Sequence, residues 1–211
     1  MRYELPPHPR YGGVQAISWS DVKAIESNAR SWYGRALGLI PKRDSPSLSY
    51  GTMVHNFIQR RDWAELGIDP IPHGNAPEET VVTEIKFKHN RKTYRFNMVG
   101  TPDDADPETI YEYKTGLKLW TRRQVETHDQ IYTYALLRYK HTGVLPKRAI
   151  LVSLETYNDG HAGIALTGQY RSIEVPITMV DILKVQARFI AAYKKAIDTI
   201  STISPEDIAG L

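Results

Sequence analysis

The residues best suited to chemistry lie in one short stretch that contains Asp103, Glu112 and Lys114. Residues 98–115 pass from an apolar segment through an acidic loop into an extended segment, residues 109–115. Side chains alternate along an extended segment, so Glu112 and Lys114 share one face. If the loop closes a hairpin, Asp103 faces Glu112 across the ladder. Two carboxylates beside a lysine can hold a divalent cation and activate a water molecule. The alternative is an exposed strand with a salt bridge and an ordinary acidic turn.

Composition limits the classes of protein to consider. The chain has 211 residues, of which 41% are hydrophobic and 24% charged, as in soluble globular proteins. We expect a Pro- and Gly-rich arm, residues 1–15, and a single domain, residues 16–211. The absence of cysteine excludes thiol nucleophiles, zinc–thiolate sites and iron–sulfur clusters. No membrane span or secretory signal is expected, so a cytoplasmic location is predicted. The net charge of +3 is compatible with an anionic partner.

Hydrophobic periodicity predicts the elements that position these residues. Residues 80–88, 93–99 and 109–115 are expected to form a three-stranded meander, with Glu84 near the acidic cluster. Further extended segments are expected at residues 148–156, 161–167 and 170–175, with a tight turn at Asn158-Asp159-Gly160. Helices are expected at residues 18–38, 47–66, 121–141 and 178–201.

The second predicted helix carries His55 beside its apolar stripe, one turn after Gly51. A glycine at that position allows another backbone segment or a ligand to approach the imidazole closely. The alternative is an ordinary histidine in the core or on the surface.

The third predicted helix carries groups that can bind phosphate. Arg122 and Arg123 lie in its first turn, and Gln130 and Tyr134 share one face. Guanidinium, amide and phenol groups all donate to phosphate oxygens. Arg30 on the first helix, next to two aromatic residues, could add a platform for bases and phosphates. The alternatives are a polar pair at the edge of the core and a solvated helix face.

The order of these signals is more specific than any one of them. The chain contains, in order, Gly51-Thr-Met-Val-His55, Gly100-Thr-Pro-Asp103, Glu112-Tyr-Lys114-Thr-Gly116 and Gln130-Ile-Tyr-Thr-Tyr134. This series resembles the PD-(D/E)XK nuclease superfamily, and within it the RecB-type exonuclease branch. The resemblance covers about residues 16–140. A lone Asp…Glu-x-Lys pattern is weakly specific, whereas four ordered blocks are strongly specific.

The resemblance implies an α/β fold with a restriction-endonuclease-like core, in which helices flank a mixed central β-sheet. It implies that Asp103 and Glu112 bind Mg²⁺ or Mn²⁺, with His55 and the Tyr113 carbonyl as further ligands. Lys114 would orient or deprotonate the attacking water. Gln130 and Tyr134 would line the site and contact DNA. Some members carry a four-cysteine iron–sulfur cluster, which this chain cannot form.

The resemblance therefore implies a metal-dependent DNA nuclease, favoured as an exonuclease, that hydrolyses phosphodiester bonds. DNA is the expected partner, with recombination, repair or replication proteins as further partners. The alternatives are a structure-specific or RNA-cleaving endonuclease and a non-catalytic module that binds DNA or another protein. Fold alone does not choose among them, nor does it decide polarity, strandedness or oligomeric state.

Overall fold

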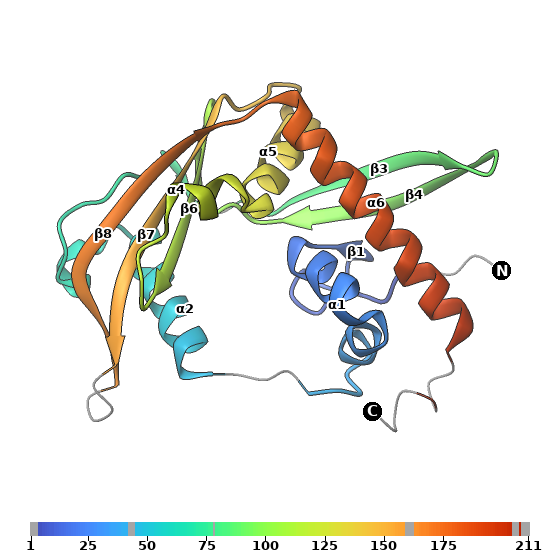
Figure 1. Cartoon of the computed structure of the whole chain (residues 1–211), viewed down its shortest axis with the longest axis horizontal. Helices are drawn as coiled ribbons and strands as arrows, with labels where there is room; N and C mark the ends of the chain where they lie inside the picture. The colour runs from blue at the N-terminus through green and yellow to red at the C-terminus, as the bar shows by residue number, and fades with distance from the viewer. Residues whose placement is uncertain (1–3, 42–44, 78, 159–162, 204–206, 208–211) are drawn as a thin grey trace. The chain divides into compact units, whose positions relative to one another are not determined.

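The computed structural model describes residues 4–41, 45–77, 79–158, 163–203 and 207 (Figure 1). The chain divides into two compact units. Unit 1 comprises Met1–Arg43, Thr80–Gly100 and Val180–Leu211, and unit 2 comprises Asp44–Glu79 and Thr101–Met179. In the part of the chain that is described, no helix has both the length and the hydropathy needed to cross a membrane.

The helices are α1 (Trp19–Ala36), α2 (Pro46–Gln59), α3 (Trp63–Leu66), α4 (Arg122–Glu126), α5 (Asp129–Thr142) and α6 (Met179–Thr202). The strands are β1 (Ala16–Ile17), β2 (Ala76–Pro77), β3 (Val81–His89), β4 (Lys92–Gly100), β5 (Asp104–Asp106), β6 (Thr109–Gly116), β7 (Arg148–Asn158) and β8 (Ile164–Pro176).

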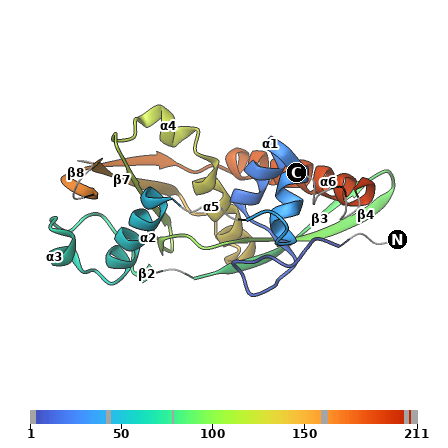
Figure 2. The same ribbon diagram turned by 90° about the horizontal axis from the view of Figure 1, so that it is seen from below.

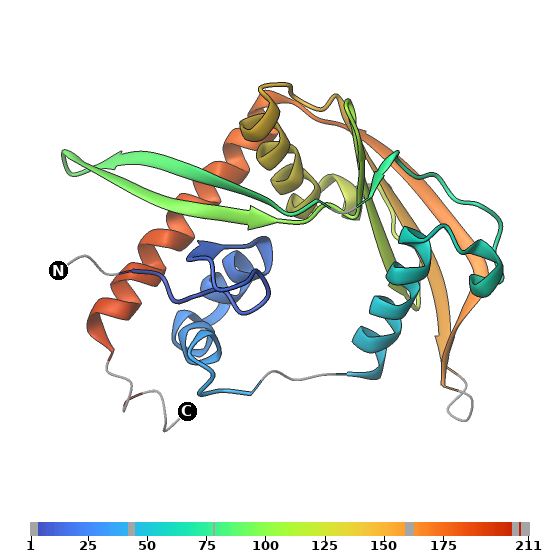
Figure 3. The same ribbon diagram turned by 180° about the vertical axis from the view of Figure 1, so that it is seen from behind.

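Unit 2 is built on a mixed five-stranded sheet in the order β2-β5-β6-β7-β8. The β6–β7 pair is parallel, while β5–β6 and β7–β8 are antiparallel. A parallel pair needs a crossover, and α4 and α5 lie in the connection from β6 to β7. α2 packs beside the same sheet, burying Val54 and Ile58 against Tyr111 and Tyr113 (Figure 3). The predicted mixed central sheet with flanking helices is confirmed.

The predicted meander is wrong. β4 pairs with β3 on one side and with β1 on the other in a separate three-stranded sheet, and β6 pairs instead with β5 and β7. The acidic loop itself supplies β5, which occupies the edge of β6 that the meander had assigned to β4. The first five residues of β6 are buried on both faces, which suits a central strand.

Besides the first predicted helix, which is kinked at Asn28, two predicted helices are interrupted. α2 ends at Gln59, and Arg61 adopts a left-handed φ of 58° before the short α3 begins. The third predicted helix divides into α4 and α5 at Thr127–His128, where the Thr127 hydroxyl donates to the Arg123 carbonyl at 2.9 Å. The two predicted segments after β7 form the single strand β8. Of the predicted turn there, Asp159 and Gly160 lie outside the described residues.

Unit 1 combines α1, α6 and the β3–β4 hairpin. Ser18 caps α1 in a capping box with Asp21, as its spacing predicted. The hairpin crosses α6 (Figures 1 and 2), and Phe96 stacks on Tyr193 with ring centroids 4.6 Å apart. In the expected N-terminal arm, His8 is buried and its Nε2 lies 2.9 Å from an Asp21 carboxylate oxygen.

Candidate active site

His55 is placed by the close approach of α2 to β6. A Cβ at Gly51 would lie 3.1 Å from Thr115 Oγ1 of β6, which is tighter than most Cβ contacts. Glycine at this position therefore lets α2 lie close to the strand, as its spacing before His55 suggested. One turn later, His55 Nε2 lies 3.3 Å from the Tyr113 carbonyl oxygen and 3.1 Å from Asp103 Oδ2.

Asp103 and Glu112 face each other at the mouth of the β5–β6 hairpin. Asp104 is paired with Tyr111, so the next pair outward along the ladder is Asp103 with Glu112. The Tyr113 amide donates to Asp103 Oδ2 at 2.8 Å, which fixes the carboxylate on the strand. Both carboxylates are buried, with Asp103 6% exposed and Glu112 fully buried.

A second chain of contacts runs from Glu112 to α5. Glu112 Oε1 forms an ion pair with Lys114 Nζ, and Lys114 Nζ donates to Gln130 Oε1 at 3.2 Å. The Gln130 amide donates to the Tyr134 hydroxyl at 2.7 Å, across one turn of α5. Residues from four separate sequence blocks therefore meet within unit 2.

The electrostatics of the cluster favour a bound positive charge. Burial raises the pKa of Glu112, and the nearby charge of Asp103 raises it further, against the opposing effect of Lys114. Burial alone would lower the pKa of His55, but its hydrogen bond to Asp103 and the charges of Asp103 and Glu112 raise it to about 9. The two carboxylates thus lack enough counter-charge, and His55 holds a proton against Asp103 Oδ2.

This donor set fits a divalent cation. Glu112 Oε2 is buried and has no hydrogen-bond partner in the part of the chain that is described. His55 Nε2, Asp103 Oδ2 and the Tyr113 carbonyl oxygen already converge on one proton, which a metal ion would displace. Among the described residues, no three His, Cys, Asp or Glu side chains lie close enough together to hold a metal ion, and Glu112 pairs with Lys114.

The structure shows a supporting pair that the sequence reasoning had not identified. Asp104, next to Asp103, is fully buried and forms an ion pair with Arg61, and its Oδ2 accepts from the Tyr113 hydroxyl at 3.4 Å. Asp104 and Asp103 point in opposite directions along the strand, so Asp104 does not stand in for Asp103. A Cβ at Gly74 would lie 2.6 Å from Asp104 Oδ1. The only sequence signal was the adjacent acidic pair.

Three arginines predicted to bind DNA lie outside this cluster of contacts. Arg122 and Arg123 are exposed on α4, where Arg122 Nη1 lies 3.4 Å from Glu126 Oε1. Arg30 is exposed on α1 in unit 1, two residues after a kink at Asn28. Their role in binding DNA stays a prediction.

The chain is similar to solved structures of exonucleases. No family model and no curated protein matches the chain. Among solved structures, a candidate exonuclease from Eubacterium rectale matches with a TM-score of 0.50 and 10% identity, over 88% of this chain and 81% of that one. The alkaline exonuclease LHK-Exo from Laribacter hongkongensis matches with a TM-score of 0.47 and 15% identity, over 88% and 90% of the two chains. A complex of LHK-Exo with dAMP matches with a TM-score of 0.44 and 16% identity, over 88% and 90% of the two chains.

The sheet order, the flanking helices and the match to the Eubacterium rectale structure agree on one architecture. The chain therefore has a restriction-endonuclease-like fold.

Proposed function

We propose that this protein is a metal-dependent nuclease that hydrolyses phosphodiester bonds in DNA, most readily at DNA ends. The observation that carries the proposal is the convergence of His55, Asp103, the Tyr113 carbonyl, Glu112 and Lys114 at one hairpin mouth. A non-catalytic module with the same fold would have no need to bury two carboxylates with insufficient counter-charge.

In this proposal Asp103, Glu112, His55 and the Tyr113 carbonyl hold Mg²⁺ or Mn²⁺. When bound, such an ion supplies positive charge to the phosphodiester and lowers the pKa of water. The imidazole nitrogen makes the donor set more suitable for Mn²⁺ than an all-oxygen site would be.

The remaining residues act on the substrate. Lys114, already held between Glu112 and Gln130, places its ammonium where it stabilises the negative charge that develops on the phosphate. Gln130 and Tyr134 donate to the DNA backbone next to the reacting phosphate. The resemblance to RecB-type exonucleases and the likeness to the Eubacterium rectale structure support the preference for ends.

End-labelled linear DNA and covalently closed circular DNA, each incubated with Mg²⁺ or Mn²⁺, test this function. We expect degradation of the linear form alone, and no cleavage by Asp103→Asn, Glu112→Gln or Lys114→Ala variants that retain the wild-type circular dichroism spectrum. Nicking of the circle would indicate an endonuclease. Absence of cleavage with both metals would leave the non-catalytic binding module as the better explanation.

A further inference from the structure

The β3–β4 hairpin of unit 1 carries a strong positive charge on one two-stranded ribbon. Residues 81–100 contain one acidic residue, Glu84, and five basic ones: Lys86, Lys88, Arg91, Lys92 and Arg95. The hairpin thus carries a net charge of +4, whereas the whole chain carries +3 and the remaining residues therefore carry −1. A localised basic stripe of this kind is the electrostatic footprint of a nucleic-acid-binding surface.

Like charges on the solvent-facing side of the hairpin lower its stability. Lys86 is paired directly with Arg95 across the ladder, and both side chains are exposed, as is Lys88 two residues along. Like charges opposite each other destabilise a strand pair. Glu84 offsets part of this repulsion, with one oxygen 2.9 Å from Lys86 Nζ and the other 3.8 Å from Arg95 Nη1.

The turn of the hairpin contains a second feature that lowers stability. Asn90 and Arg91 both have positive φ, 48° and 61°, as the two central residues of a tight hairpin turn require. Asparagine is favoured at the first position, and glycine is favoured at the second. Arg91 at the second position has a strained left-handed backbone, and its side chain adds one more exposed cation at the tip.

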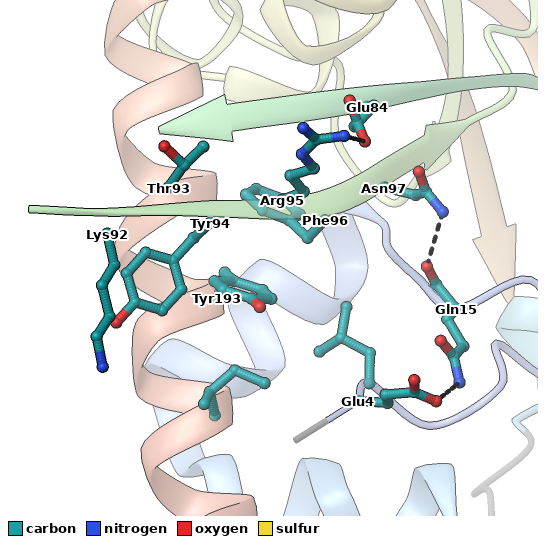
Figure 4. Close-up of a pocket in the computed structure, with 12 residues that line it drawn as sticks. Glu4, Gln15, Glu84, Lys92, Thr93, Tyr94, Arg95, Phe96, Asn97 and Tyr193 are labelled. Carbon is teal, nitrogen blue, oxygen red and sulfur yellow. Dashed lines mark hydrogen bonds and ion pairs between the residues drawn. The ribbon is translucent and has the colours of Figure 1, made fainter. Parts of the chain in front are cut away.

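A neighbouring groove shares Arg95 and Glu84 with this face, but its charges are balanced. The groove lies along β4 and encloses about 950 Å³ (Figure 4). Its lining balances Lys92 and Arg95 against Glu4 and Glu84. The hairpin's aromatic rings lie on the opposite face of the ribbon from Lys86 and Arg95 and pack toward α6, where Phe87 contacts Tyr193 at 5.9 Å between ring centroids. The basic face therefore has no aromatic platform for stacking single-stranded bases.

We propose that the basic face of the β3–β4 hairpin, defined by Lys86, Lys88, Arg91 and Arg95, binds the phosphate backbone of duplex DNA without reading its sequence. The residues of this surface belong to unit 1, whereas those of the candidate active site belong to unit 2. The proposal rests on the proposed function only in taking DNA as the nucleic acid. Duplex DNA is the occupant because it has the higher density of phosphate charge and needs no stacking surface.

The test is the salt dependence of DNA binding by the full chain, measured by fluorescence anisotropy with a labelled duplex and the matching single strand. EDTA in the buffer prevents cleavage. Each phosphate contact contributes about 0.9 to the magnitude of the slope of log K against log salt. For duplex DNA, the slope of the variant Lys86→Gln/Lys88→Gln/Arg95→Gln should therefore be smaller in magnitude by up to about 2.7.

A matched control removes the same charge elsewhere. Lys23, Lys140 and Lys184 are exposed on α1, α5 and α6, and the variant with all three changed to Gln should keep the wild-type slope. Arg91→Gly separates loss of charge from loss of fold, because glycine is favoured in the left-handed turn. This variant should unfold at a higher urea concentration, yet the magnitude of its salt slope should fall by about 0.9. Equal slopes for the hairpin and control variants would overturn the proposal, as would a loss confined to the single strand.

Hydrolysis of a small chromogenic phosphodiester separates this inference from the proposed function. The hairpin variant should hydrolyse it at the wild-type rate, since no duplex is involved. If no variant hydrolyses this substrate or DNA, and the hairpin variant still loses slope, the proposed function fails while the DNA-binding surface stands. If hydrolysis is normal and the slopes are equal, only the surface is refuted.

Discussion

The buried pair of Arg61 and Asp104 predicts an asymmetric response to mutation. Asp104 is fully buried, whereas the Arg61 side chain is 27% exposed and also donates to the Ile58 and Gly74 carbonyls at 3.1 and 2.9 Å. Arg61→Met leaves a carboxylate without its counter-ion inside the protein, which costs about 3–5 kcal/mol. Asp104→Asn leaves an arginine that keeps two hydrogen bonds and reaches water, so its cost should be about 1–3 kcal/mol.

Urea unfolding followed by circular dichroism measures both costs. The double variant should lose less than the sum of the two single variants, by about 1 kcal/mol or more, because it leaves no unpaired charge. Arg60→Met, at an exposed neighbouring residue whose guanidinium lies over the Phe57 ring, serves as the control and should cost below about 1 kcal/mol. Equal costs for the two single variants, or additive behaviour of the double variant, would refute this account of the pair.

Three further predictions concern the fold and the substrate contacts. In urea unfolding, Gly74→Ala should destabilise unit 2 by more than Gly51→Ala. A Cβ at residue 74 would lie 2.6–2.7 Å from a buried carboxylate and from backbone atoms, whereas the nearest atom to a Cβ at residue 51 is a rotatable hydroxyl at 3.1 Å. Equal losses of stability would contradict this prediction. Burial would raise the pKa of Asp21, but hydrogen bonds from His8 and Ser18 hold it below its usual range. Its folded pKa is therefore depressed, so its contribution is present above about pH 4 and is lost as the pH falls further. Asp21→Asn should flatten this part of the acid unfolding curve, and an unchanged curve would exclude the role. Gln130→Ala and Tyr134→Phe should weaken DNA affinity or turnover more than they weaken Mn²⁺ affinity in parallel titrations; normal binding and cleavage would return the pair to a structural role.

The local part of the candidate site could be predicted from sequence because it depends on local geometry. Alternation along one strand and the closing of one short loop are enough to bring Asp103, Glu112 and Lys114 together. Placing His55 needed more, since its approach to Tyr113 depends on packing between elements far apart in sequence. The Gly51–His55 spacing and the family resemblance indicated this position of His55, which hydrophobic periodicity could not indicate.

The features of the fold that were not predicted depend on contacts between distant segments or on residue types that carry no local signal. The pairing of β4 with β1, not with β6, joins residues that periodicity along each strand does not relate. The break after α2 occurs at Arg61, a residue type that carries no signal for a left-handed backbone. The same side chain then forms the ion pair with Asp104, which no local pattern could have indicated.

The central claim is that His55, Asp103 and Glu112 together form a divalent cation site, and calorimetric titration with Mn²⁺ tests it most directly. Wild-type protein should bind Mn²⁺ more tightly than Mg²⁺, because an imidazole nitrogen is among the donors. His55→Ala and Glu112→Gln should each lose most of that affinity, while Glu84→Gln, at an exposed carboxylate of the hairpin, should bind as the wild type does. Wild-type protein that binds no Mn²⁺, or a His55→Ala variant with undiminished affinity, would contradict the account.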